Sequence, residues 1–356
     1  MSAFFGLFGN DKNAKAVGID IGSSAVKVVE IGLKGDYYSL LTYGSLALGP
    51  YAGKEIGRAV VLPQEKLVEA ITDLLQETKV SSKVAGFTIP LRSSFLRVIE
   101  IPPVEEKYLK TVIPIEARKY VPVPIDEVSL GWTVLPPQYN SGDPGKMDVI
   151  LAAIHNDILN SYTQIASRLN LESKILEIEA FSAMRGMGEA YSVPTLICDI
   201  GALSTKIYVV FDGLTWLAHS IGKGSQDITL NLSKVMGLTI EEAELLKRGE
   251  GVNSNNADVK SIISLLMQNV FVEIKRVTAL FESRRGKKIE RIVLSGAGAL
   301  MPGIEGLWSE EFKLPVDKSE PFKQIDTLEV LKKALQEAGP EFAGAMGVAM
   351  GALGAH

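Results

Sequence analysis

The chain has 356 residues, of which 46% are apolar and 22% are charged, and its formal net charge is −5. This length exceeds one ordinary hydrophobic core and predicts two lobes or four smaller subdomains. The negative balance gives no general attraction for nucleic acid or anionic lipid. The single cysteine, Cys198, excludes an internal disulfide and a multi-cysteine zinc site, and it fits a reducing cytoplasm.

No stretch reaches the roughly 18–20 apolar residues of a membrane span. The N-terminal residues 4–8 are mostly apolar, but no basic residue precedes them and Asp11 follows closely, so they make a poor signal peptide. A docking arm and a frayed tail are equally consistent with this segment.

The first predicted element is a β-hairpin over residues 16–31. Its strands are rich in valine and isoleucine and flank a turn with Asp20, Gly22, Ser23 and Ser24. Such a turn suits a phosphate group, because glycine permits close backbone approach while amides and hydroxyls donate hydrogen bonds. The aspartate is suited to holding hydrated Mg²⁺, although a lone turn of this kind is more often only a turn.

The next segments complete a first lobe and then change character. Residues 37–48 alternate like a strand, a helix begins near Pro63, and residues 84–89 form a short buried strand. Prolines crowd residues 90–176, where the predicted order is strand, helix, strand, strand, helix, strand. This order predicts a compact inserted α/β unit. A proline-rich linker is the alternative, and the alternating apolar residues between the prolines argue against it.

The hairpin then occurs a second time, after a predicted helix over residues 179–187. Residues 195–211 place Asp199, Gly201, Ser204 and Thr205 between two β-branched strands. Two copies of the same turn predict a duplicated domain with a ligand held between the halves.

The remaining elements follow in order. A glycine-rich loop (Gly222, Lys223 and Gly224) leads to helices over residues 226–236, 238–248 and 260–283, with Thr239 as an expected N-cap. The C-terminal part predicts a strand with a glycine turn over 292–303, a late strand over 321–325, and a helix rich in small residues from Glu341.

Taken together, these segments resemble the actin-like ATPase superfamily, which includes actin, the heat-shock chaperones, MreB, FtsA and the sugar kinases. Residues 20–24 and 199–205 resemble its two phosphate loops, and residues 295–303 its adenosine loop. Residues 179–183 and 342–350 resemble its two connecting helices, whose small residues suit a close crossing at a hinge. The resemblance implies a duplicated, ribonuclease H-like α/β fold that binds ATP and Mg²⁺ between two lobes.

The resemblance also implies roles for individual residues. It assigns the metal to Asp20 and Asp199, and the orientation of an attacking water to Glu179, for which a structural helix-terminal charge is the alternative. Glu273 and Arg276 match a pair that chaperones place against adenosine, and an ordinary surface ion pair is equally consistent with them. The remaining nucleotide contacts are implied at Gly22, Ser23, Ser24, Lys27, Gly201, Ser204, Thr205, Gly222, Lys223, Gly224, Gly296, Ala297 and Gly298.

Within the superfamily, the insertion resembles the PilM family of type IV pilus assembly proteins. Residues 111–128 carry that family's pattern, with Glu116-Ala before Tyr120 and the run Val-Pro-Val-Pro ending at Pro124. The resemblance implies four subdomains with an FtsA-type insertion. Their expected bounds are residues 14–89, 177–194 and 341–356 for the first core, 90–176 for the insertion, 195–215 and 287–340 for the second core, and 216–286 for the last subdomain.

The PilM resemblance further implies a cytoplasmic protein at the inner face of the cytoplasmic membrane. Its expected partner is the N-terminal tail of PilN, a single-span inner-membrane protein, held between the insertion and the first lobe. Apolar residues beside the prolines of the insertion suit an extended peptide, namely Ile115, Tyr120, Val121 and Val123. Motor ATPase components of the pilus and further copies of the chain are additional expected partners.

The second phosphate loop departs from active hydrolases. Ala202 and Leu203 replace close-approach glycines, and Lys223 interrupts the glycine pair of the following loop. Fewer donors then surround a γ-phosphate, so at most slow Mg-dependent hydrolysis is expected, with Lys223 as a point charge on the phosphate.

Two other functions remain open on the sequence. A sugar or carboxylate kinase shares the fold, but the single cysteine excludes the kinases with a cysteine-rich zinc site, and no Asp-rich substrate loop lies between the phosphate loops. An FtsA-like filament protein normally ends in a basic amphipathic helix, whereas residues 341–356 contain no Lys, Arg or Trp. The sequence therefore favours an ATP-binding assembly scaffold.

Overall fold

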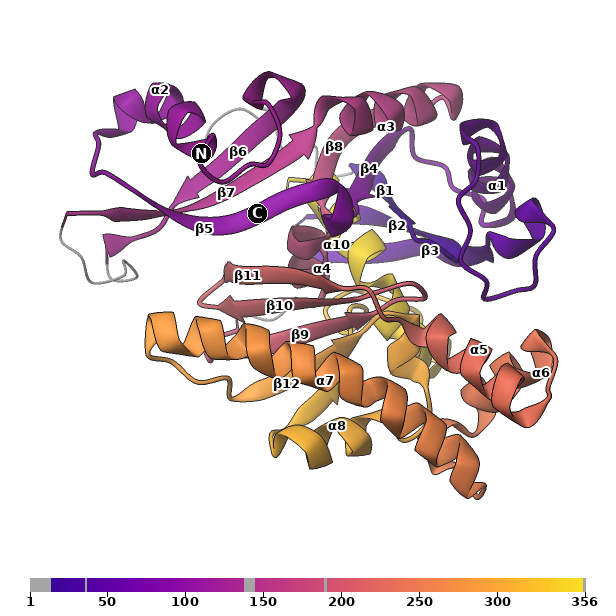
Figure 1. Ribbon diagram of the computed structural model, residues 1–356. Coiled ribbons are helices and arrows are strands. Elements are labelled where there is room, and N and C mark those ends of the chain that lie inside the picture. Colours follow the sequence, from indigo (N-terminus) through magenta and orange to yellow (C-terminus); the bar gives the residue numbers. More distant parts are fainter. Residues whose placement is uncertain (1–13, 36, 138–144, 189–190, 355–356) are drawn as a thin grey trace.

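The computed structural model describes residues 14–35, 37–137, 145–188 and 191–354. Two lobes are stacked one above the other, and a smaller α/β unit lies beside the upper lobe and above the lower one (Figure 1). The apolar residues 4–8 at the N-terminus lie outside the described residues. In the described part of the chain, no helix combines the length and the apolar character needed to cross a membrane.

The first lobe is built on a five-stranded sheet of order β3-β2-β1-β4-β8. β1 pairs antiparallel with β2 and parallel with β4, as expected for a hairpin followed by a crossover helix. Helices α1 (Gln64–Glu77) and α3 (Asn156–Arg168) bury apolar residues against one face of this sheet. The strands are β1 (Lys15–Ile21), β2 (Ala25–Lys34), β3 (Tyr37–Ala47), β4 (Val84–Ile89) and β8 (Glu172–Ile178).

The second lobe repeats this arrangement in a sheet of order β11-β10-β9-β12-β13. β9 pairs antiparallel with β10 and parallel with β12, so it holds the place that β1 holds in the first lobe. Helices α7 (Ala257–Arg285) and α8 (Ile304–Phe312) cover one face (Figure 1). The strands are β9 (Thr195–Ile200), β10 (Thr205–Phe211), β11 (Leu214–Ile221), β12 (Arg291–Ser295) and β13 (Val316–Lys318).

Two further helices extend the second lobe, α5 (Ser225–Met236) and α6 (Ile240–Gly249). α6 begins at the expected N-cap: the Glu242 amide donates to the Thr239 hydroxyl at 3.2 Å, and the Thr239 amide donates back to the Glu242 carboxylate at 2.8 Å. α9 (Lys332–Ala338) was not expected from the sequence.

Two helices rich in small residues, α4 (Glu179–Gly186) and α10 (Ala343–Ala352), cross between the lobes. Their backbones touch: a Cβ at Gly347 would lie 1.7 Å from the Ser182 carbonyl oxygen, and one at Gly186 would lie 2.0 Å from that of Ala343. α10 also presses on the first sheet, where a Cβ at Gly18 would lie 1.9 Å from the Ala345 carbonyl oxygen. Only glycine permits these approaches, so the close crossing that the small residues indicate is present.

The inserted unit is a three-stranded sheet of order β5-β7-β6, covered on one face by α2 (Glu106–Ala117). Its strands are β5 (Ser94–Ile101), β6 (Val128–Val134) and β7 (Met147–His155). α2 continues through Pro114.

Two expected boundaries and one expected strand are wrong. Residues 156–176 do not belong to the insertion, because α3 packs on the first lobe and β8 pairs in parallel with β4, completing the first sheet. Likewise β11 does not belong to the last subdomain, because it pairs with β10. Residues 321–325 form turns rather than a strand, and Phe322 and Ile325 bury their side chains near α10.

Candidate functional site

The two hairpin turns line one cleft between the lobes, together with α4 and the loop after β12. About 70 Å³ of space remains in this cleft, which is a small fraction of the several hundred Å³ of an ordinary ligand pocket. The structure thus brings together most of the residues that the sequence predicts, namely Asp20, Gly22, Ser23, Ser24, Lys27, Glu179, Asp199, Gly201, Ser204, Gly296 and Ala297.

The two hairpins match each other beyond the turn itself. Asp20 at the end of β1 pairs in register with Lys27 on β2, and Asp199 at the end of β9 pairs in register with Lys206 on β10. Each half of the cleft therefore has an aspartate and a lysine on adjacent strands. A role was predicted from the sequence for Lys27 but none for Lys206, although each lysine follows its aspartate by the same number of residues.

Lys206 is the centre of a cluster of acidic groups. Its ammonium lies 3.0 Å from Oδ2 of Asp199 and 3.2 Å from Oε2 of Glu179. Burial alone would lower the pKa of Lys206, but the charges of Asp199, Glu179 and Asp20 outweigh it and raise the pKa. Lys206 is therefore a fixed positive charge.

Glu179 opens α4 and faces the same cluster. Its Oε1 accepts a hydrogen bond from the Leu91 amide at 2.7 Å, while Oε2 pairs with Lys206. Burial raises the pKa of Glu179, opposed by the charge of Lys206. Both carboxylate oxygens of Glu179 thus already have a protein partner in this arrangement.

Other predicted residues support the cleft without lining it. The buried Thr205 hydroxyl donates to the Lys223 carbonyl at 2.9 Å, which ties the second turn to the glycine-rich loop. Gly224 is needed for close packing, since a Cβ there would lie 2.3 Å from the Ala202 carbonyl oxygen, and Gly298 packs in the same way on Ile200. Gly222 borders open space, and the ammonium of the half-exposed Lys223 lies 3.9 Å from the Asp227 carboxylate.

Glu273 and Arg276 do not line the cleft. Glu273 accepts a hydrogen bond from Arg276 at 2.7 Å and lies 2.9 Å from Nε2 of His219 on β11. The hydrogen bonds from Arg276, with His219 adding to them, lower the pKa of Glu273 to about 2. Glu273 and Arg276 thus form an ordinary ion pair on α7, which is the second of the two interpretations that the sequence allows. Neither residue lines the candidate nucleotide site.

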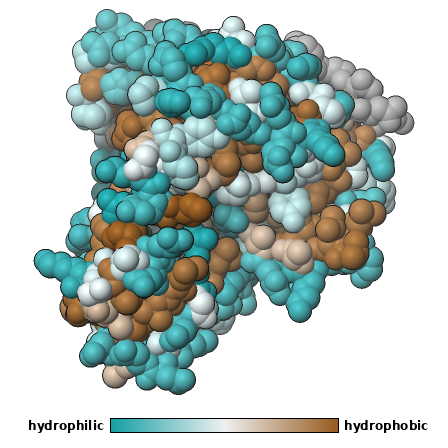
Figure 2. Space-filling model, turned by 90° about the vertical axis from the view of Figure 1, so that its right-hand side faces the viewer, coloured by the Kyte–Doolittle hydropathy of each residue, from teal (hydrophilic) through white to brown (hydrophobic). Residues whose placement is uncertain are grey.

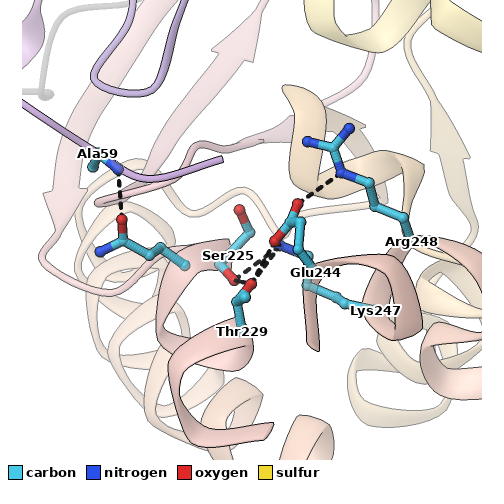
Figure 3. A network of polar contacts seen from close by, with 7 residues as sticks. Ala59, Ser225, Thr229, Glu244, Lys247 and Arg248 are labelled. Carbon is cyan, nitrogen blue, oxygen red and sulfur yellow. Dashed lines mark hydrogen bonds and ion pairs between the residues drawn. The ribbon is translucent and has the colours of Figure 1, made fainter. Parts of the chain in front are cut away.

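A second polar cluster with the same sequence spacing lies on α6 and was missed (Figure 3). Glu244 accepts hydrogen bonds from Thr229 at 2.6 Å, from Lys247 at 2.7 Å and from Arg248 at 2.7 Å. Lys247 also donates to the Ser225 carbonyl, at the start of α5, at 3.3 Å. The cluster fixes α6 on α5, directly after the glycine-rich loop.

A loop of the first lobe meets this region. The Ala59 amide donates to the Gln226 side chain at 2.6 Å (Figure 3), and a Cβ at Gly57 would lie 3.2 Å from the Glu244 carboxyl carbon. Figure 2 shows this side of the molecule, on which the upper and lower parts are in contact. This contact joins the two lobes beside the glycine-rich loop.

The expected Mg²⁺ does not fit the residues as they are arranged. Asp199 and Glu179 already share the ammonium of Lys206, and Asp20 accepts a hydrogen bond from the Thr88 hydroxyl at 2.5 Å. In the described ranges, no three or more His, Cys, Asp or Glu side chains are grouped so as to hold a metal ion.

Comparison with known families decides the classification. The model of the type IV pilus assembly protein PilM matches residues 18–353. The chain belongs to the PilM family. This PilM family member is also similar in structure to a solved PilM–PilN type IV pilus biogenesis complex, with a TM-score of 0.81 and 23% identity over 96% of this chain and 100% of the other.

More distant solved structures have the same fold. The ethanolamine utilization protein EutJ from Carboxydothermus hydrogenoformans matches with a TM-score of 0.53 and 14% identity over 96% of this chain and 91% of the other. MreB 5 of Spiroplasma citri bound to AMPPNP matches with a TM-score of 0.53 and 14% identity over 94% of each chain. The fold of this PilM family member is therefore the duplicated actin-like fold that its sequence indicates.

Proposed function

We propose that this PilM family member is an ATP-binding scaffold for type IV pilus assembly, which docks the N-terminal tail of a PilN-like protein at the inner face of the cytoplasmic membrane. The observation that supports nucleotide binding most strongly is that the duplicated turns, 20–24 and 199–205, meet at one cleft. The solved PilM–PilN complex and the AMPPNP-bound MreB 5 support the partner and the nucleotide, respectively.

In this proposal, the phosphates lie between the two turns. The amides of Gly22 and Gly201 are used within their own turns, at 3.0 Å from the carbonyls of Ala25 and Ser204. The phosphate donors that we assign are therefore the hydroxyls of Ser23, Ser24 and Ser204 and the ammonium of Lys27. Gly296 and Ala297 flank the adenosine at the other end of the cleft, where Ala297 is exposed.

Turnover is expected to be far below the ~10 s⁻¹ typical of enzymes. Glu179 is the best-placed carboxylate for orienting water, but the Leu91 amide and Lys206 engage its two oxygens. A phosphate-release assay on the purified protein, with and without the tail peptide, measures this rate. Release at ordinary enzymatic rates without a partner would contradict the scaffold function.

The partner's tail is assigned to the inserted unit, since both turns and the loop after β12 lie outside that unit. Of the four apolar residues expected to receive it, Val121 is a core residue with 6% exposure, whereas Ile115 is 55% exposed. Tyr120 lies at a groove of about 680 Å³ between the inserted unit and the second lobe. We place the tail in this groove, whereas the sequence resemblance implies a position between the insertion and the first lobe.

The groove has features that suit an extended peptide. Among the described strands, β5 and β11 are each at an edge of their own sheet, and residues of both line the groove. Edge strands offer unpaired backbone groups to an added strand, and pockets between side chains then give specificity. The side chains of Trp216, Leu280 and Phe281 supply an apolar wall.

Replacing Leu280 with glutamate is expected to weaken binding of the tail by about 10- to 100-fold, the equivalent of one buried apolar side chain. Leu280 is 51% exposed on α7, so the fold tolerates the change. Leu265→Glu is the matched control, because Leu265 is 70% exposed on the same helix and does not line the groove. A synthetic tail peptide is titrated against both variants; equal, undiminished affinities would exclude this groove as the docking site.

A further inference from the structure

The ammonium of Lys206 lies beside Asp199, one of the two aspartates to which the sequence resemblance assigns the metal ion. Lys206 stands on β10 opposite Asp199, and its ammonium bridges Asp199 and Glu179 at 3.0 Å and 3.2 Å. We propose that Lys206 is the resident cation of the cleft and that this protein binds ATP without a divalent metal. The inference rests on the proposed nucleotide site and concerns how that site balances charge.

The position of the ammonium allows contact with a phosphate. It lies beside the second turn, since a Cβ built on Gly201 would be 3.5 Å from Nζ of Lys206. Its counterpart in the first hairpin, Lys27, stands opposite Asp20 and lines the same cleft. A lysine is a compact point charge on a flexible stem, so one lysine from each half can face the phosphates.

The same arrangement leaves no place for hydrated Mg²⁺. That ion keeps several of its waters and demands near-octahedral geometry. In this cleft the carboxylates of Asp199 and Glu179 already have a cation between them, at 3.0 Å and 3.2 Å. A divalent ion at these carboxylates would also lie next to the ammonium, and like charges repel most strongly where water is excluded.

The alternative is that Lys206 only stabilises the folded hinge, by joining α4 to the second hairpin. In that case the ion pairs of Lys206 break when the nucleotide enters, and Mg²⁺ replaces the ammonium between the carboxylates of Asp199 and Glu179. The two alternatives differ in the metal dependence of nucleotide binding, which can be measured without any hydrolysis.

The experiment is calorimetric titration of ATP into the full-length protein, once in EDTA and once in excess MgCl₂. The wild-type dissociation constant is expected to change by less than about threefold between the two buffers. Lys206→Met is expected to bind about 10- to 100-fold more weakly in EDTA, the loss of one charged contact, and to recover affinity when Mg²⁺ is added. Lys206→Gln is a second variant that keeps a polar group in the cluster, and Lys234→Met is the control for loss of an exposed lysine charge on α5.

Thermal unfolding of each variant establishes that it is folded before titration. A wild-type protein that binds ATP only with Mg²⁺ would overturn the inference and leave the nucleotide site standing. Metal-independent binding by both Lys206→Met and Lys206→Gln at wild-type affinity would also overturn it. A wild-type protein that binds no ATP in either buffer would remove the nucleotide site and this inference together.

Discussion

Replacing Gly347 with alanine is expected to lower the free energy of unfolding by about 3 kcal/mol or more, a large effect for one methyl group. The added Cβ would lie 1.7 Å from the Ser182 carbonyl oxygen and 2.7 Å from the Gly186 amide nitrogen. Both atoms belong to the backbone of α4, so no side chain can move aside. The two helices must separate, and with them the contact between the lobes.

Helix propensity alone predicts that alanine raises the free energy of unfolding, so the two explanations make opposite predictions for Gly347→Ala. In an open helix interior, glycine to alanine stabilises by roughly 1 kcal/mol. Gly306→Ala provides that control, because Gly306 lies within α8 and a Cβ there meets no atom within 4 Å. Urea unfolding of the two variants and the wild type measures both effects. If Gly347→Ala is as stable as Gly306→Ala, the close crossing of α4 and α10 is wrong.

The duplicated architecture was predictable because its signals are local. Both Asp-Ile-Gly turns follow apolar strands in the sequence, and the small residues of the crossing helices indicate a close approach of backbones. The insertion boundary was not predictable in the same way. The apolar residues of β8 suit either sheet, and only the pairing with β4 assigns them to the first lobe.

In the candidate site, too, some residues could be located from the sequence and others only from the packing of helices. Glu273 with Arg276 and Glu244 with Lys247 have identical spacing on helices, so the sequence could not tell which pair lies near the glycine-rich loop. Packing decides it, since α6 rests on α5. Lys206 is different: its offset from Asp199 repeats that of Lys27 from Asp20, and extending the repeat beyond the turn would have found it.

Filling the adenosine end of the cleft is expected to have the largest effect on ligand binding. Ala297→Trp places an indole where the proposal places adenosine, and affinity for ATP is expected to fall by about 100-fold or more, some 2.7 kcal/mol. Ala297 is exposed and follows Gly296 at the end of β12, so the larger side chain displaces no core residue. Ala297→Ser is the matched control, because it changes polarity but hardly changes volume.

Titration of ATP into the wild type, Ala297→Ser and Ala297→Trp, each first shown to unfold cooperatively at a similar temperature, tests the nucleotide site most directly. The proposal predicts saturable binding to the first two proteins and at least about 100-fold weaker binding to the third. Equal affinity in all three, or no binding by the wild type, would contradict it.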